Sequence, residues 1–243
     1  MSSDAAELAA AEANYFETWR MITANAPGGA VEETDELLFT SVPVPVAYFN
    51  SAFVKPPADP RRCLDQAREF FGDRNVPYTV RYRENEFADL PSDGTSPLMV
   101  APVGDIGPPA ATDIRVVDAN SWADHVATIA AGFAMPLGVL TSLFTASLLD
   151  TASYAGFIAY DASEPVSTAA LIVTDGVAGI YNVATPEPFR GRGFGEATTA
   201  AAVAEGARRG CTRTTLQASA MGYPLYERMG FRSVARWHSF TGA

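Results

Sequence analysis

Residues 182–197 read NVATPEPFRGRGFGEA, which predicts the end of a strand, a glycine-rich turn and the start of a helix. The apolar run that ends at Ala184 is typical of a buried strand, and the alanine-rich run after Gly193 is typical of a long helix. Glycine lets the backbone approach a phosphate and adopt positive φ angles. The first N–H groups of a helix lack internal partners, and its positive end favours an anion. We therefore expect an anion cradle here. Its residues are Arg190, Gly191, Arg192, Gly193, Phe194, Gly195 and Glu196.

Familiar nucleotide and metal motifs do not account for this segment. The dinucleotide fingerprint fails because Glu196 and Thr198 stand where its third glycine would be. A Walker loop is excluded because Lys55, the only lysine, precedes Pro56. The chain has no G-x-S-x-G elbow, and its two cysteines and two histidines are too few for a cysteine-rich zinc site, so no metal is expected. A glycine-rich turn that merely precedes a helix is the alternative to a ligand-binding loop.

A second segment, about thirty residues further on, gives the cradle a context. Residues 219–231 read SAMGYPLYERMGF, which is typical of a short aromatic-bearing helix that ends at Gly-Phe before a last strand. Together with Arg190-x-x-Gly193-x-Gly195, this segment resembles the two motifs of the GNAT N-acetyltransferase superfamily, in the family's order and spacing. The resemblance covers about residues 112–243.

The resemblance implies that acetyl-CoA lies across a splay between two parallel strands, at 177–185 and 214–218. Backbone groups of Val183 and Ala184 would pair with the pantetheine arm, and one N–H near Val183 would polarise the thioester carbonyl. Tyr226 stands where the family keeps a tyrosine that protonates the leaving thiolate, although a packed tyrosine is the alternative. The implied cofactor-binding residues are Val183, Ala184, Arg190, Gly191, Arg192, Gly193, Phe194, Gly195, Glu196 and Ser219.

Two roles stay open in this interpretation. Ser219 stands where the family often has an asparagine that contacts the CoA arm, but a serine there is also typical of a helix N-cap. The acceptor amine must lose a proton before it attacks, and the strand at 177–182 carries no carboxylate. Glu187 in the next turn, or a water relayed by Asn182 or Tyr181, is an alternative, so no base is assigned.

The rest of the chain predicts mixed helices and strands, which is typical of the α+β class. With the resemblance, this implies a GNAT-type mixed, splayed central sheet flanked by helices. Helices are expected over 4–24, 59–71, 121–132, 137–149, 193–209 and 222–229, and strands over 36–42, 47–54, 77–83, 97–103, 114–118, 153–160, 166–174, 177–185, 214–218 and 231–239.

The Gly/Pro stretch GDIGPPAAT at 104–112 reads as a linker between domains at 1–110 and 111–243. Elements of the two halves match in order at an offset of about 135 residues, which predicts a tandem with a degenerate GNAT-like N-terminal half. Chance agreement of element order is the alternative. The segment Lys55–Pro60 would replace the cradle in the first half, but it has three prolines and no glycine. We therefore expect the first half to complete the sheet and wall the acceptor pocket without binding CoA.

The charged residues are also distributed unequally between the two predicted halves. The formal net charge is −11, yet residues 1–110 hold 17 acidic and 8 basic residues, whereas 187–236 hold 4 glutamates and 8 arginines. Such acidity argues against a protein that coats nucleic acid or an anionic membrane, and an acidic first half would suit a cationic amine. The sequence has no run of 18 apolar residues and no signal peptide, so a cytoplasmic location is expected.

The sequence thus predicts an acetyl-CoA-dependent N-acetyltransferase that acts on a primary amine of a small molecule or amino-acid-like acceptor, by direct attack in a ternary complex. One alternative is acetylation of a protein N-terminus or lysine, and another is a CoA-binding regulator of the same fold without turnover. The oligomeric state stays open, a homodimer included.

Overall fold

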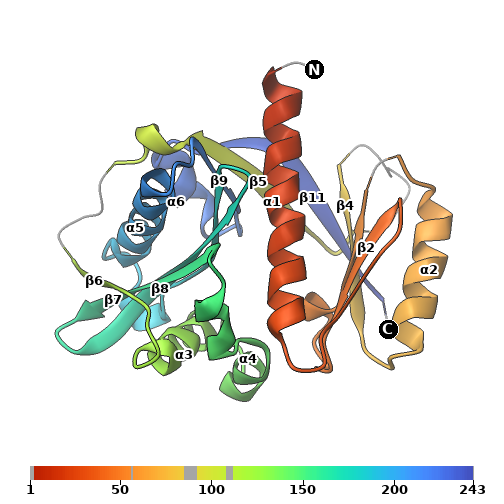
Figure 1. Ribbon diagram of the computed structural model, residues 1–243, viewed down its shortest axis with the longest axis horizontal. Helices are drawn as coiled ribbons and strands as arrows, with labels where there is room; N and C mark the ends of the chain where they lie inside the picture. Colours follow the sequence, from red (N-terminus) through yellow and green to blue (C-terminus); the bar gives the residue numbers. More distant parts are fainter. Residues whose placement is uncertain (1–2, 56, 85–91, 108–111, 243) are drawn as a thin grey trace.

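Eleven strands form one mixed sheet in this computed structural model, which describes residues 3–55, 57–84, 92–107 and 112–242. Helices cover both faces of the sheet (Figure 1). The first part of the chain forms α1 (Ser3–Asn25), β1 (Ala30–Glu33), β2 (Leu37–Ser41), the 3-10 turn η1 (Ala47–Phe49), β3 (Ser51–Val54), α2 (Pro60–Gly72), β4 (Tyr78–Arg83), β5 (Gly94–Pro102) and η2 (Val103–Asp105). The remainder forms β6 (Asp113–Val116), α3 (Trp122–Gly132), α4 (Leu137–Leu143), η3 (Ala146–Asp150), β7 (Tyr154–Asp161), β8 (Glu164–Thr174), β9 (Val177–Ala184), η4 (Glu187–Phe189), α5 (Phe194–Arg208), β10 (Arg213–Gln217), α6 (Tyr223–Arg228) and β11 (Arg232–Gly242).

These elements confirm the α+β class and most of the predicted helices and strands. The helix expected over 137–149 is wrong in length, because α4 ends at Leu143. Thr145 is extended, with φ −97° and ψ 152°, and a separate 3-10 turn follows at Ala146–Asp150. This break lets the chain change direction and bury Leu148 completely. The strand expected from residue 47 begins only at Ser51.

Strand β1 was not predicted, because two of its four residues are glutamates. Charged side chains are a usual feature of edge strands, which they protect from pairing with other chains. Glu32 lies 2.7 Å from Arg74, and Glu33 lies 2.7 Å from Lys55. The position of β1 at the edge of the sheet therefore explains why half of its residues are charged.

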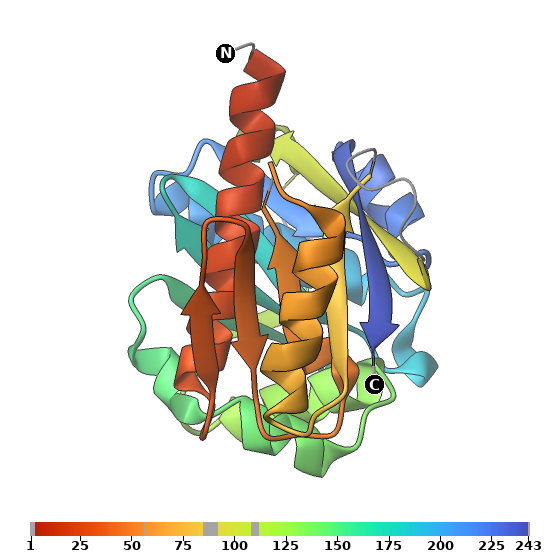
Figure 2. The ribbon, with the colours of Figure 1, turned by 90° about the vertical axis from the view of Figure 1, so that its right-hand side faces the viewer.

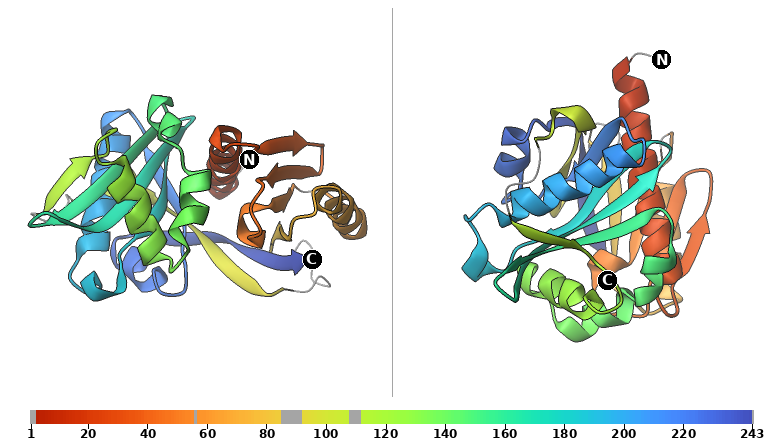
Figure 3. Two further views of the ribbon diagram at one scale, coloured as in Figure 1. Left: turned by 90° about the horizontal axis from the view of Figure 1, so that it is seen from below. Right: turned by 60° about the vertical axis from the view of Figure 1, so that its left-hand side comes forward.

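The strand order is β1-β2-β3-β4-β11-β5-β10-β9-β8-β7-β6. In each half two parallel strands are joined through a helix: β3 and β4 through α2, and β9 and β10 through α5. The next strand in each half comes from the other half. β5 pairs antiparallel with β10, and β11 pairs antiparallel with β4. Figure 3 shows β5 and β11 side by side at the junction of the halves.

The sheet therefore runs without interruption through the junction of the two predicted domains. The division at about residue 110 stays a prediction, and part of its proposed linker, at 108–111, lies outside the described residues. No helix in the described ranges is both long enough and apolar enough to cross a membrane.

Helix α1 crosses the junction and packs on strands of both halves (Figures 1 and 2). The Asn14 side-chain amide donates to the carbonyl oxygens of Ile172 at 3.0 Å and Val177 at 3.3 Å. Gly179 makes this approach possible, since a Cβ there would lie 1.9 Å from Asn14 Oδ1. Glu7 forms ion pairs with Arg213 and Arg232 at the other end of the crossing. The first helix is thereby fixed to the second half of the sheet.

Three apolar cores hold the layers together. One lies under α2, a second under α5 and α6, and the third under α1, α3 and α4. Representative buried residues are Phe71 and Val80 in the first core, Leu216 and Phe231 in the second, and Phe53, Ile129 and Trp237 in the third. Side chains alternate between the faces of each strand, so residues 179, 181, 215 and 217 face away from α5.

Candidate active site

The parallel strands β9 and β10 separate part-way along their length. Their pairing in the described chain runs from Val177 with Arg213 to Gly179 with Thr215 and then ends. Asn182 has φ 51°, and the register between β8 and β9 shifts beside it. A bulge of this kind bends its strand and turns it from its neighbour. The sequence prediction of a splay between these two strands is confirmed.

Val183 and Ala184 lie on the β9 side of this opening. Val183 is half-buried within the bulge, and Ala184 is buried opposite Thr168 of β8. The carbonyl of Ala184 accepts a hydrogen bond from Ser167 at 3.3 Å. The structure thus places both predicted residues beside the splay.

The glycine-rich loop leads from β9 into α5. Gly191 and Gly193 have φ angles of 73° and 83°, and a Cβ on either would meet no atom within 4 Å. Gly193 is the N-cap of α5 and has no side chain to cap it. Within the described residues, the N–H groups from Gly191 to Glu196 donate to no acceptor. Six successive N–H groups without an acceptor, at the start of a helix, fit the binding of a phosphate.

The two arginines of the loop differ in what they contact. Arg190 donates from Nε to the Thr185 carbonyl and from Nη2 to the Gly132 carbonyl, both at 3.0 Å. It therefore ties the loop to the end of α3, and no described carboxylate forms an ion pair with it. Arg192 lies 2.6 Å from the Asp161 carboxylate, which neutralises it. The sequence predicted two cations for the ligand, but it did not foresee these partners.

Tyr226 lies on α6, with its side chain buried against the second core. Its ring is edge-on to Phe231, with the centroids 5.9 Å apart. Burial raises the pKa of the Tyr226 phenol to about 12, although a hydrogen bond with Thr199 opposes this shift. The hydroxyl therefore holds its proton throughout the neutral range and is available to donate it.

Ser219 lies in the turn between β10 and α6. Its Oγ accepts a hydrogen bond from the Gly222 N–H at 3.1 Å, and its carbonyl accepts from Tyr223 at 2.9 Å. These bonds close the turn that leads into α6, whose N-cap is Gly222. Contact with a cofactor stays a prediction for this residue.

Two side chains that the sequence prediction did not assign to the cofactor border the splay. Within the described chain, Asn182 Nδ2 and Gln217 Nε2 are buried and have no hydrogen-bond partner. Asn182 lies at the bulge of β9 and Gln217 at the end of β10. Buried amides normally have partners, so this pair fits a ligand with amide groups, such as pantetheine. The sequence did carry a signal for Gln217, because it is a polar residue at the end of the strand RTTLQ.

The structure does not assign a carboxylate as the base that deprotonates the acceptor amine. Glu187 is exposed on η4. The Tyr181 hydroxyl donates to Asn14 Oδ1 at 2.7 Å, and burial raises the pKa of this phenol well above its ordinary value. Tyr181 therefore stays protonated at neutral pH and is not itself a base.

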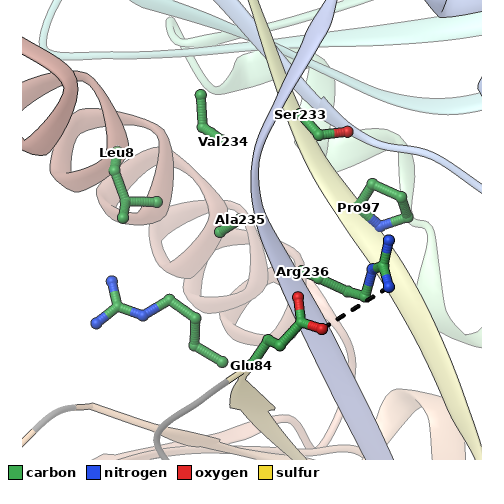
Figure 4. A pocket seen from close by; sticks show the side chains of 8 residues that line it. Leu8, Glu84, Pro97, Ser233, Val234, Ala235 and Arg236 are labelled. Atoms are coloured by element: carbon green, nitrogen blue, oxygen red, sulfur yellow. Dashed lines mark ion pairs between the residues drawn. The ribbon is translucent and has the colours of Figure 1, made fainter.

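A cavity of about 400 Å³ lies at the junction of the halves, between α1 and strands β4, β5 and β11 (Figure 4). Its walls carry charged side chains, and Arg236 lies 3.7 Å from Glu84. None of the residues predicted for the cofactor lines it. Its walls are Leu8, Arg83, Glu84, Pro97, Ser233, Val234, Ala235 and Arg236. Among the described residues, no group of histidine, cysteine, aspartate and glutamate side chains is arranged to hold a metal ion.

Comparison with solved structures confirms the fold over nearly the whole chain. A GCN5-related N-acetyltransferase from Kribbella flavida matches with a TM-score of 0.72 and 19% identity, over 96% of each chain. A functionally unknown conserved protein from Staphylococcus epidermidis matches with a TM-score of 0.66 and 15% identity, over 92% of this chain and 96% of that one. A GCN5-related N-acetyltransferase from Sphaerobacter thermophilus matches with a TM-score of 0.61 and 17% identity, over 87% and 81%.

Sequence comparison identifies a domain within the chain. No match was found among the curated proteins. Residues 152–233 match the model of the acetyltransferase (GNAT) domain, and this stretch includes the splay, the cradle and Tyr226. This part of the chain is therefore similar to the GNAT acetyltransferase domain.

Proposed function

We propose that the protein is an acetyl-CoA-dependent N-acetyltransferase that acts on a primary amine of a small molecule or amino-acid-like acceptor. The observation that carries the proposal is the row of six free N–H groups from Gly191 to Glu196, beside the opening between β9 and β10. The row of N–H groups suits a diphosphate, and the opening between the two strands suits a slender pantetheine arm. The unpartnered amides of Asn182 and Gln217 support the same cofactor.

When bound, acetyl-CoA supplies an activated acetyl thioester. The chain's own groups then have separate tasks. The cradle holds the diphosphate, and an N–H beside Val183 polarises the thioester carbonyl. Tyr226 donates its proton to the departing thiolate as the amine attacks directly in a ternary complex.

Thiol release from acetyl-CoA across a panel of amines tests this proposal. Wild type is expected to turn over with at least one amine. Tyr226→Phe is expected to lower kcat by about 10²–10⁴-fold, the range for loss of a general acid, with little change in acetyl-CoA affinity. Tight cofactor binding without turnover of any amine would contradict the proposal.

A CoA-binding protein without turnover is the second candidate. It is favoured by the exposed position of Glu187 and the protonated state of Tyr181, because neither residue is then a ready base. The protonated state of Tyr226 does not separate the two candidates, because a buried tyrosine of either protein would keep its proton. The same amine panel separates the two candidates.

A further inference from the structure

Three hydroxyl groups meet at the base of the loop between β9 and α5. Ser167 of β8 is fully buried, and its Oγ lies 2.9 Å from Thr185 Oγ1 and 3.2 Å from Thr198 Oγ1. Thr185 directly follows β9, and Thr198 lies near the start of α5. The three side chains therefore connect the end of β9 to the start of α5, across the loop that carries the free N–H groups.

The three hydroxyls form a chain of hydrogen bonds. Each hydroxyl has one proton to donate. One arrangement satisfies every contact in the chain: Thr185 donates to Ser167, and Ser167 donates to Thr198. Thr198 in turn donates to the Phe194 carbonyl of its own helix at 3.1 Å. Successive hydrogen bonds of this kind strengthen one another, so loss of the central hydroxyl breaks the whole connection.

The third glycine of the loop leaves room for this connection. A Cβ on Gly195 would lie 3.2 Å from Thr185 Oγ1, which is tighter than an ordinary contact. The carbonyl of Thr185 accepts the hydrogen bond from Arg190 Nε at 3.0 Å. Through its hydroxyl and its carbonyl, Thr185 thus holds both the start of α5 and the middle of the loop.

We propose that Ser167 is a positioning residue for acetyl-CoA, because it fixes the cradle relative to the opening between β9 and β10. This inference rests on the proposed function and deepens it. Ser167 acts through Thr185 and Thr198 and does not contact the cofactor. The diphosphate binds at the start of α5 and the pantetheine arm beside β9, so one molecule spans both elements that Ser167 joins. Its affinity then depends on their relative position, whereas the affinity of a fragment that binds only one of them does not.

Fragments of the cofactor test this inference without any need for turnover. Titration calorimetry of the full chain compares CoA with ADP, which has the diphosphate without the arm, and with pantetheine, which has the arm alone. Ser167→Ala is expected to weaken CoA binding about tenfold and to change the affinities of ADP and pantetheine by no more than about twofold. Thr185→Val removes the first hydroxyl of the chain at nearly constant shape and is expected to do the same.

A matched control is available in the first half. Ser51 of β3 is also fully buried, and its Oγ donates to the Tyr48 carbonyl at 3.2 Å. Ser51→Ala therefore removes an equally buried serine hydroxyl far along the sheet from the loop. It is expected to leave the affinities of CoA and of both fragments unchanged.

Unchanged CoA affinity in Ser167→Ala would overturn the inference. So would an equal loss for CoA and ADP, because it would mean that the cradle itself is damaged. Thermal unfolding shows whether Ser167→Ala is folded, and Thr185→Val provides the test if it is not. A loss confined to CoA without turnover of any amine would contradict the proposed function alone, and no binding of CoA by wild type would overturn both.

Discussion

Helices α2 and α5 occupy matching places in the two halves, but their N-termini are opposites. Each helix follows one strand of a parallel pair and leads back to the other. At α2 the Asp59 carboxylate accepts from the N–H groups of Arg61 at 2.9 Å and Arg62 at 3.2 Å. At α5 the N-cap is Gly193, and the donors stay free. One helix end is filled by an anion of the chain itself, and the other is open to an external anion.

The parallel strands differ less than the helix ends. The last paired residue of β3 is Phe53, which is fully buried, whereas that of β9 is Gly179, against which the Asn14 side chain of α1 packs. The space beside each strand is therefore filled at this level. The difference between the helix ends shows that a shared topology does not confer a binding site, whereas free N–H donors can.

Transfer of the α2 cap to α5 is expected to have the largest effect. Gly193→Asp would place a carboxylate against the free N–H groups and would repel a diphosphate. Acetyl-CoA should bind at least about 100-fold more weakly, which corresponds to about 2.7 kcal/mol, in calorimetry. Gly193→Asn imposes the same positive φ without the charge and should lose much less. Equal affinities of the two variants would refute the cradle.

The loop arginines are expected to have intermediate and unequal effects. Arg190→Ala removes a charge that no described carboxylate pairs with, together with the bonds to Thr185 and Gly132, so acetyl-CoA affinity should fall about tenfold. Arg192→Ala removes a charge that Asp161 already neutralises, so its loss should be about two- to threefold. Calorimetry at two salt concentrations would measure both. The reverse order would mean that Arg192, and not Arg190, serves the ligand.

The smallest effect is expected in the first half. Asp59→Ala removes the N-cap of α2 and should lower the free energy of unfolding by about 1 kcal/mol in urea denaturation. The acetyl-CoA affinity should not change, and calorimetry should still give one site per chain. A second site, in this variant or in wild type, would contradict the contrast between the two helices.

Local features of this molecule were predictable from its sequence, and long-range ones were not. The start of α2 at Asp59-Pro60 and the glycines of the cradle are local signals, because capping and positive φ depend on adjacent residues. The bond from Asn14 to Val177 joins residues 163 positions apart, and no periodicity predicts it. The prediction for Arg190 was incomplete for the same reason, because the Gly132 carbonyl that accepts its hydrogen bond lies 58 positions away.

The exchange of strands β5 and β11 has a consequence for synthesis on the ribosome. Strand β10 finds its partner β5 already made, but β4 and β5 both pair with β11, which follows all the other described strands. Until residues 232–242 leave the exit tunnel, the nascent protein exposes two unpaired strand edges, which are sites for aggregation. We therefore expect truncation before β11 to leave both halves incomplete, so that pairing of the eleven residues of β11 is needed to join the two halves of the sheet.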